Sequence, residues 1–442
     1  MQPVATNPAT GPALPHKHKV LETLLLVTYW CSSTVYATVV MKLSSTLCAI
    51  SAAVSCHAQA GRLHQEPLST SAAHLSLTHD LISFHQNLTQ IESITGNEKQ
   101  VGEWLVSSLE SQGYNVEKQQ VSADPERFNV LAWPGKQRDA KVLLSSHIDT
   151  VPPFYPYHHK DSATNRTISG RGSVDAKGSV ATQVLAANEL LSKHELSPDD
   201  IAMLYVVGEE TGGDGMRAAN SLGLRPQTII FGEPTEGKLA SGHKGNLAVI
   251  LTAKGKAAHS GYPWLGRSAN EVLVKALAAL MELGQKLPES DKYGVTTFNL
   301  GRIEGGVAAN VVAQDAMANI AVRIAEGTPA FIKKEIVKAV HSAVKSFLDD
   351  DMEAEDVIGL EFPSAGYAPV DIDSDVPGFE VITVNYGTDI PNLNQTVDGQ
   401  KRYLYGPGSI LVAHSDHEML TEAQLFDAVG GYKKLIRHAL GH

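Results

Sequence analysis

Three stretches of sequence, one after another along the chain, determine the fold: KVLLSSHID (141–149), GSVATQVLAANELLSK (178–193) and IAMLYVV (201–207). The first and third contain apolar runs, Val142–Ser146 and Ile201–Val207, with the length and composition of buried strands. The stretch between them predicts a helix over Gly178–Lys193, and Thr228–Phe231 predicts another strand. This alternation indicates an α/β fold, a largely parallel sheet with helices on its faces.

The pattern changes after Gly242, where strands and helices no longer alternate in this way. The predicted elements of this part are strands at Leu247–Lys254, Thr296–Arg302 and Val311–Ile324 and helices at Ser268–Lys286 and Phe331–Asp350. The α/β pattern returns with a strand at Val381–Val384 and a helix at Gln424–Leu440. We therefore expect a three-layer α/β/α domain over 79–242 and 356–442, with an α+β domain inserted at 243–355.

Length and charge agree with this two-domain interpretation. The 442 residues exceed the usual size of one hydrophobic core, and 43% of them are hydrophobic, as in globular proteins. The formal net charge of -12 argues against a nucleic-acid partner, which would require a basic surface.

The N-terminal region predicts secretion. Residues 41–60 combine a lysine, an apolar stretch and Ala58-Gln-Ala60, the pattern of a signal peptide with its cleavage site. Residues 1–40 then precede the true start, and 61–78 form a flexible lead-in. An alternative is a membrane anchor over 20–54. The glycosylation sequons fit secretion and begin at Asn87, Asn165 and Asn394.

All three cysteines, Cys31, Cys48 and Cys56, precede the predicted cleavage site. A mature chain that starts after Ala60 therefore contains neither disulfides nor thiolate ligands. Any metal site in it must use His, Asp and Glu side chains.

Polar residues of this kind follow several of the predicted strands. In open α/β sheets, ligands bind beyond the carboxyl ends of the strands, so one pocket can collect these side chains. Asp175 also belongs to this set, because it lies in the glycine-rich loop 170–178 that opens a helix. The others are His147 and Asp149 after Val142–Ser146, Glu209 and Glu210 after Ile201–Val207, Glu233 after Thr228–Phe231, and His414 after a strand expected at Ser409–Ala413.

These residues can form two metal sites that share one ligand. His147, Glu233 and Asp175 would hold one ion, and Glu210, His414 and Asp175 the other, with a shared water in each fourth position. Three protein ligands and an open position are typical of catalytic zinc, although cobalt or manganese would also bind.

Two carboxylates remain outside these ligand sets. Asp149 can fix the orientation of His147, and Glu209 can act as the general base. Taken singly, the His-x-Asp and Glu-Glu pairs are more often surface features, and the glycine-rich loop lacks the phosphate-binding spacings. The prediction therefore rests on the joint pattern.

Four motifs in order resemble one enzyme family. They are Ser146-His-Ile-Asp-Thr-Val151, Gly170-Arg-Gly-Ser-Val-Asp-Ala-Lys-Gly178, Gly208-Glu-Glu-Thr211 and Gly232-Glu-Pro-Thr235. The chain over residues 80–440 resembles the zinc-dependent family of acetylornithine deacetylase, succinyl-diaminopimelate desuccinylase, aminoacylase and glutamate carboxypeptidase. The resemblance implies that the insert acts as a lid over the active site and as a dimerisation domain.

The resemblance also implies roles for individual residues. It assigns His147, Asp175, Glu210, Glu233 and His414 as the ligands of two zinc ions, and Asp149 and Glu209 as their catalytic neighbours. In the insert, His259 would stabilise the oxyanion, in relatives sometimes from the partner subunit, and Asn310 and Arg323 would bind the substrate carboxylate. His417 departs from the family's final motif and stays an alternative ligand to His414.

The family and the secretion signal together favour a secreted carboxypeptidase that acts on peptides through a metal-bridging water. The substrate would then be a peptide cut next to its free carboxylate. One alternative is a hydrolase of N-acyl amino acids, and another is a peptide-binding protein that has lost catalysis. A homodimer formed through the insert is the expected partner.

Overall fold

The computed structural model describes residues 80–162 and 166–442. The predicted signal peptide, lead-in and alternative membrane anchor lie outside these residues, as do the three cysteines and the Asn165 sequon. Among the helices that are described, none is both long and apolar enough to cross a membrane.

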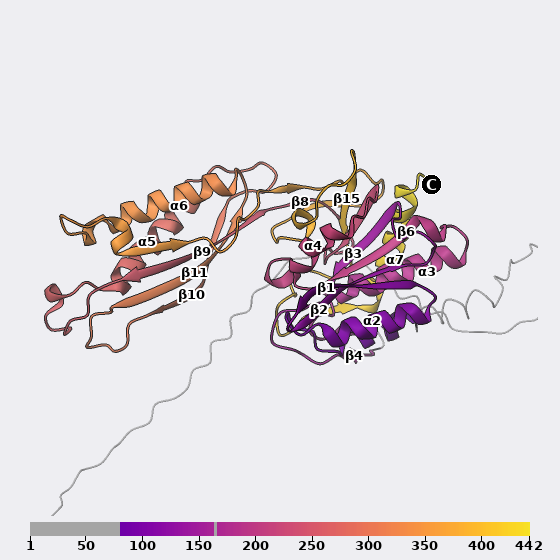
Figure 1. Cartoon of the computed structure of the whole chain (residues 1–442), viewed down its shortest axis with the longest axis horizontal. Coiled ribbons are helices and arrows are strands. Elements are labelled where there is room, and N and C mark those ends of the chain that lie inside the picture. Colours follow the sequence, from indigo (N-terminus) through magenta and orange to yellow (C-terminus); the bar gives the residue numbers. More distant parts are fainter. Residues whose placement is uncertain (1–79, 163–165) are drawn as a thin grey trace, which may run out of the picture. The chain divides into compact units, whose positions relative to one another are not determined.

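A six-stranded sheet forms the centre of the first domain (Figure 1). In spatial order its strands are β1 (Asn115–Ala123), β2 (Glu126–Trp133), β6 (Ile201–Val206), β3 (Val142–His147), β7 (Thr228–Gly232) and β15 (Lys401–Tyr405). The last four are parallel, whereas β2 runs antiparallel to β6 and β1 antiparallel to β2. Every residue of β3, β6 and β7 is buried, as their apolar composition predicts.

The two faces of this sheet pack into separate cores because successive side chains point to opposite sides. On one face, Leu144 and Met203 join a core with the helices α2 (Lys99–Ser111), α3 (Lys177–Ser192) and α7 (Glu422–Ala439). Residues 80–89 add a further helix to this core. The α/β expectation is therefore confirmed.

A thinner layer covers the other face, where Leu143 and Leu204 lie. It contains the short helix α4 (Asp214–Ala219) and a three-stranded sheet of β13 (Val370–Asp371), β8 (Leu239–His243) and β14 (Val381–Val384). A second small sheet joins β16 (Met419–Thr421), β5 (Thr167–Ser169) and β4 (His158–Lys160).

The inserted domain has a core of its own. Its antiparallel sheet has the order β10 (Thr297–Gly305), β11 (Asp315–Ile324), β9 (Gly245–Lys254) and β12 (Ile358–Glu361). Helices α5 (Ala269–Gly284) and α6 (Pro329–Val344) pack on one face of this sheet (Figure 1). Because β12 pairs with β9, the domain runs to Glu361 rather than ending at 355.

One expected strand was wrong. Ser409–Ala413 forms turns, and the sheet strand in this region is β15, several residues earlier. The chain leaves the sheet at Gly406-Pro-Gly408, where proline offers no amide hydrogen and Gly408 has a φ of 73°. Two other boundaries also shift: the expected strand from Val311 begins at Asp315, and the helix expected to reach Asp350 ends at Val344.

Candidate metal centre

His147 is the last residue of β3 and is buried. Its Nδ1 lies 3.0 Å from the main-chain oxygen of Asp149, which fixes the ring. Its Nε2 faces two carboxylates, at 3.1 Å from Asp175 Oδ1 and 3.8 Å from Glu233 Oε1. One nitrogen of His147 is therefore held by the protein, and the other is directed to acidic side chains.

Asp175 lies between two histidines. Its Oδ1 is the oxygen near His147, and its Oδ2 lies 3.2 Å from His414 Nε2. The loop that carries it depends on Gly172, which has a φ of 84° and where a Cβ would come within 2.8 Å of Thr150 Cγ2. The two oxygens of one carboxylate thus face two different imidazoles.

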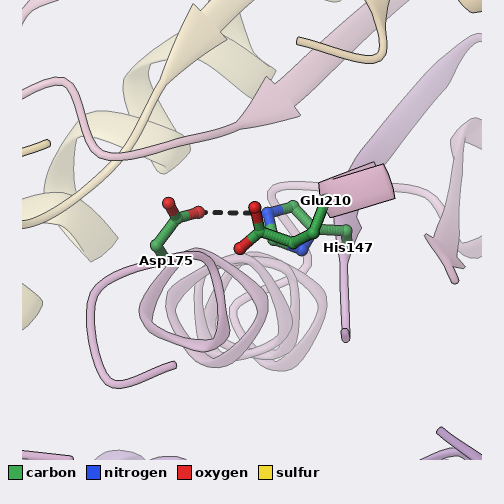
Figure 2. Close-up of side chains that lie close together, drawn as sticks. All are labelled: His147, Asp175 and Glu210. Atoms are coloured by element: carbon green, nitrogen blue, oxygen red, sulfur yellow. Dashed lines mark hydrogen bonds and ion pairs between the residues drawn. The ribbon is translucent and has the colours of Figure 1, made fainter. Parts of the chain in front are cut away.

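Glu210 and His414 complete the second half of the centre. Glu210 lies in a short turn, Glu209–Thr211, directly after β6, and its Oε2 is 3.0 Å from His414 Nε2. One ligand atom each from His147, Asp175 and Glu210 can be chosen so that all lie within 4.8 Å of one another. Figure 2 shows these three side chains converging, with Asp175 facing the other two. This group spans both of the ligand sets expected from the sequence.

Asp149 contacts His147 through both its carboxylate and its main-chain oxygen. Its carboxylate is 3.5 Å from His147 Nδ1, farther than its main-chain oxygen. The carboxylate accepts hydrogen bonds from Thr95 Oγ1 at 2.7 Å and from the amides of Glu209 and Glu210 at 3.1 and 3.2 Å. Asp149 therefore joins the end of β3 to the turn that carries both glutamates.

The charges at this centre favour bound cations. Burial raises the pKa of Glu209 and of Glu233 well above the usual range, and neighbouring carboxylates raise both further against the opposing charge of His147. Hydrogen bonds from His414 to Asp175 and Glu210 raise the pKa of His414 to about 10. Divalent cations among these carboxylates would supply the positive charge that offsets the repulsion between them. The residues present therefore fit a metal centre of His and carboxylate ligands.

His417, the alternative ligand, points elsewhere. Its side chain is 67% exposed and pairs with Asp416 at 2.9 Å. His414 is the histidine that reaches Asp175 and Glu210, from a turn in which it has a φ of 63°.

The structure places the predicted residues of the insert at opposite ends of its sheet. The ten residues of β9 span roughly 30 Å from Gly245 to Lys254. Beyond Lys254, His259 is exposed and its main chain bridges to Val311, next to Asn310.

Arg323 pairs with Asn246, at the opposite end of β9, so it is not brought to Asn310. Among the described residues no hydrogen bond or ion pair engages the Arg323 guanidinium. Arg323 lies beside Gly387, where a Cβ would come within 3.4 Å of its Nη1.

The sequence interpretation missed Asp389. Its side chain is 5% exposed, and burial raises its pKa to about 6. One oxygen accepts a hydrogen bond from Asn392 at 3.0 Å, and the other has no partner among the described residues. The only signal was a Gly-Thr-Asp sequence a few residues after the predicted strand Val381–Val384.

Of the two described sequons, Asn394 is exposed and Asn87 is half-buried on the helix 80–89. Both are therefore accessible at the protein surface.

An α/β domain that gathers His and carboxylate side chains beyond its strand ends, with an α+β insert, defines a class of metal-dependent hydrolases. A family model for the M20 peptidase dimerisation domain matches residues 241–352. A probable carboxypeptidase of Emericella nidulans is 50% identical over 385 residues, which are 81% of this chain and 89% of that protein. A probable carboxypeptidase of Aspergillus flavus is 49% identical over 384 residues, 81% and 87% of the two chains.

Solved structures show the same fold. A tripeptidase from Staphylococcus aureus has a TM-score of 0.67 and 21% identity, covering 83% of this chain and 99% of its own. An M20 family metallo-carboxypeptidase from Sulfolobus solfataricus has a TM-score of 0.60 and 17% identity, covering 81% and 99%. The chain belongs to the M20 metallopeptidase family and is a metal-dependent hydrolase. The resemblance seen in the sequence motifs is confirmed.

Proposed function

We propose that this protein is a two-zinc carboxypeptidase that cleaves the amide bond next to a free carboxylate. The observation that carries the proposal is the position of Asp175, whose two oxygens face His147 and His414 separately. A single carboxylate between two imidazoles fits a pair of metal ions that share this carboxylate as a ligand.

The ligands divide into two sets. His147, Glu233 and Asp175 would hold one zinc ion, and Glu210, His414 and Asp175 would hold the other. When bound, the two ions supply electrostatic polarisation of the scissile carbonyl and lower the pKa of water at the site.

Residues of the chain itself account for the proton transfers and for orientation. Glu209 lies next to the ligand Glu210, so it is placed to take a proton from the attacking water and return it to the leaving amine. The Asp149 carboxylate accepts a hydrogen bond from the main-chain amide of Glu209, and this contact keeps Glu209 in place.

The guanidinium of Arg323, which has no hydrogen-bond or ion-pair partner among the described residues, is the group we assign to the substrate carboxylate. Arginine binds a carboxylate through two parallel hydrogen bonds, which would set the position of the bond to be cut. The names of the fungal relatives, probable carboxypeptidases, support this assignment.

We infer that the molecule is a homodimer and that His259 completes the active site of the partner. Within one chain, His259 lies at the end of the inserted sheet opposite to Gly245, where the chain enters the insert. The matched dimerisation domain supports assembly through this insert. His259 and Asn310 from one subunit would then act together with Arg323 of the other.

We also propose that the protein is secreted after cleavage behind Ala60, with glycans at Asn87, Asn165 and Asn394. N-terminal sequencing of the protein from the culture medium tests this. A mature chain that begins at Gly61 supports secretion, whereas a cell-bound protein with residues 20–54 still attached contradicts it.

A panel of substrates tests the reaction. The zinc-loaded protein is assayed with N-blocked dipeptides, with the same dipeptides amidated at the C-terminus, and with N-acetyl amino acids. Release of the C-terminal residue from the free-acid dipeptides alone supports a carboxypeptidase. Preferential hydrolysis of the N-acetyl amino acids would instead assign a deacylase.

A further inference from the structure

Glu418 accepts three main-chain hydrogen bonds from the loop that carries Asp175. Its side chain is buried. Glu418 Oε1 accepts hydrogen bonds from the amides of Val174 at 2.9 Å and Asp175 at 3.2 Å. Its main-chain oxygen accepts another from the amide of Gly170 at 3.3 Å. The start and the middle of the loop are therefore attached to one residue far away in the sequence.

Arg171 balances the charge of Glu418. Its Nη1 donates to Glu418 Oε2 at 2.7 Å, and both side chains are almost fully buried. Its Nε donates to the main-chain oxygen of Pro153 at 3.2 Å, and its guanidinium lies over the ring of Tyr155. Because both charges are paired and hydrogen-bonded, the burial of this ion pair is compensated, and the loss of one partner would leave the other uncompensated.

Position in the chain connects these contacts to the metal centre. Glu418 is four residues after His414, whose Nε2 meets Asp175 Oδ2 at 3.2 Å. The segment 414–418 therefore holds Asp175 twice, at its carboxylate through His414 and at its amide through Glu418. A displacement of Glu418 would move Asp175 relative to both His147 and His414.

We propose that Glu418, held by Arg171, is a positioning residue that sets the Asp175 carboxylate between His147 and His414, where it would hold both metal ions. The inference rests on the proposed two-zinc function. A purely structural ion pair would stabilise the fold but would have no particular effect on metal affinity, whereas a positioning residue affects metal affinity and turnover more than stability.

The test compares Glu418→Gln with a matched variant, Glu189→Gln. Glu189 is also a buried carboxylate in an ion pair, with Lys433 at 2.6 Å, but that pair joins α3 to α7 and does not contact the Asp175 loop. Zinc affinity is measured by competition with a chelating dye, kcat and KM with a dipeptide substrate, and Tm on the metal-free proteins.

We expect Glu418→Gln to bind zinc 10- to 100-fold more weakly, the usual effect of losing a residue that supports metal ligands, with kcat reduced and KM nearly unchanged. Glu189→Gln should keep the zinc affinity of the unmodified protein, while the two variants show similar changes in Tm. Glu418→Asp retains the charge but shortens the side chain, so it should fold and show an intermediate loss of zinc affinity, even where the glutamine variant does not fold.

Unchanged zinc affinity and kcat in Glu418→Asp, or in a folded Glu418→Gln, would overturn the inference. An equal loss of zinc affinity in Glu189→Gln would overturn it as well. If the unmodified protein binds fewer than two zinc ions, the proposed function fails first, and that result is separate from any effect of the variants.

Discussion

At the scale of single residues, the centre combines buried acids with few basic groups. Asp175, Glu209, Glu210 and Glu233 lie together with two imidazoles, an arrangement that is costly without cations because buried like charges repel. Glu209 is the acid in this group that the two ligand sets leave free, which makes it the candidate for proton transfer.

Replacing Glu209 with glutamine should therefore separate metal binding from catalysis. We expect Glu209→Gln to keep its zinc content and to lose about 10²-fold or more in kcat, the scale of general-base catalysis. Metal analysis and steady-state kinetics measure the two effects. Glu110→Gln, an exposed position on α2, serves as the control. Near-full activity of Glu209→Gln would remove Glu209 from the mechanism.

The guanidinium of Arg323 gives a second prediction. Arg323→Ala should raise KM for free-acid dipeptides by about 10- to 100-fold, because a charged hydrogen-bonded contact is lost. KM for the amidated dipeptides should change little. Arg302→Ala, on the neighbouring strand β10, removes an arginine that already pairs with Glu304 and should have no effect. An equal increase for both substrate types would show that Arg323 does not contact the carboxylate.

Much of the site could be predicted at this scale, because apolar runs mark the ends of strands. His147 ends a fully buried strand, and Glu210 and Glu233 each follow one; such strands are recognisable from composition alone. Asp389 could not be placed, since it lies in a loop whose path depends on tertiary contacts. The main-chain contact of Asp149 with His147 was also invisible, because sequence spacing does not distinguish a carbonyl from a carboxylate.

At the scale of elements, the sequence showed helix α3 and the buried strands β3, β6 and β7, but not the hairpin of β1 and β2. β1 has only half-buried and exposed residues and few apolar side chains, so it lacks the apolar pattern of a strand. The reverse error occurred at 409–413, where the apolar residues Ile410, Leu411 and Val412 suggested a strand. The chain leaves the sheet at the preceding Gly-Pro-Gly sequence, so these residues lie in turns instead.

Helix α5 offers an element-scale test of the dimer. Val274 and Met281 are seven residues apart, on the outer face of α5, and are 64% and 59% exposed. Exposed apolar side chains on one helix face are typical of an interface. We expect Val274→Glu combined with Met281→Glu to yield a monomer in light scattering after size-exclusion chromatography.

Lys334→Glu, an exposed charge change on α6, is the control for this variant and should remain dimeric. A double variant that is still a dimer would show that this face of α5 is not part of the interface.

At the scale of the whole molecule, the placement of His259 predicts that two defective chains can repair each other. A dimer of one His259→Ala chain and one Glu209→Gln chain has one site with both intact residues, if His259 acts across the interface. Random mixing should therefore restore about a quarter of the unmodified activity, since half of the dimers are mixed and each has one competent site.

Each variant alone should remain nearly inactive, and activity of the mixture no greater than that of the separate variants would contradict action in trans. The monomeric α5 variant should also have low activity, because no partner subunit can supply His259.

The central claim is that Asp175 bridges two metal ions, and crystallography of the zinc-loaded protein at the zinc absorption edge tests it most directly. We predict two anomalous peaks roughly 3.5–4 Å apart. Asp175 Oδ1 should coordinate the ion at His147, and Oδ2 the ion at His414. A single peak, or two peaks of which only one contacts Asp175, would contradict the account.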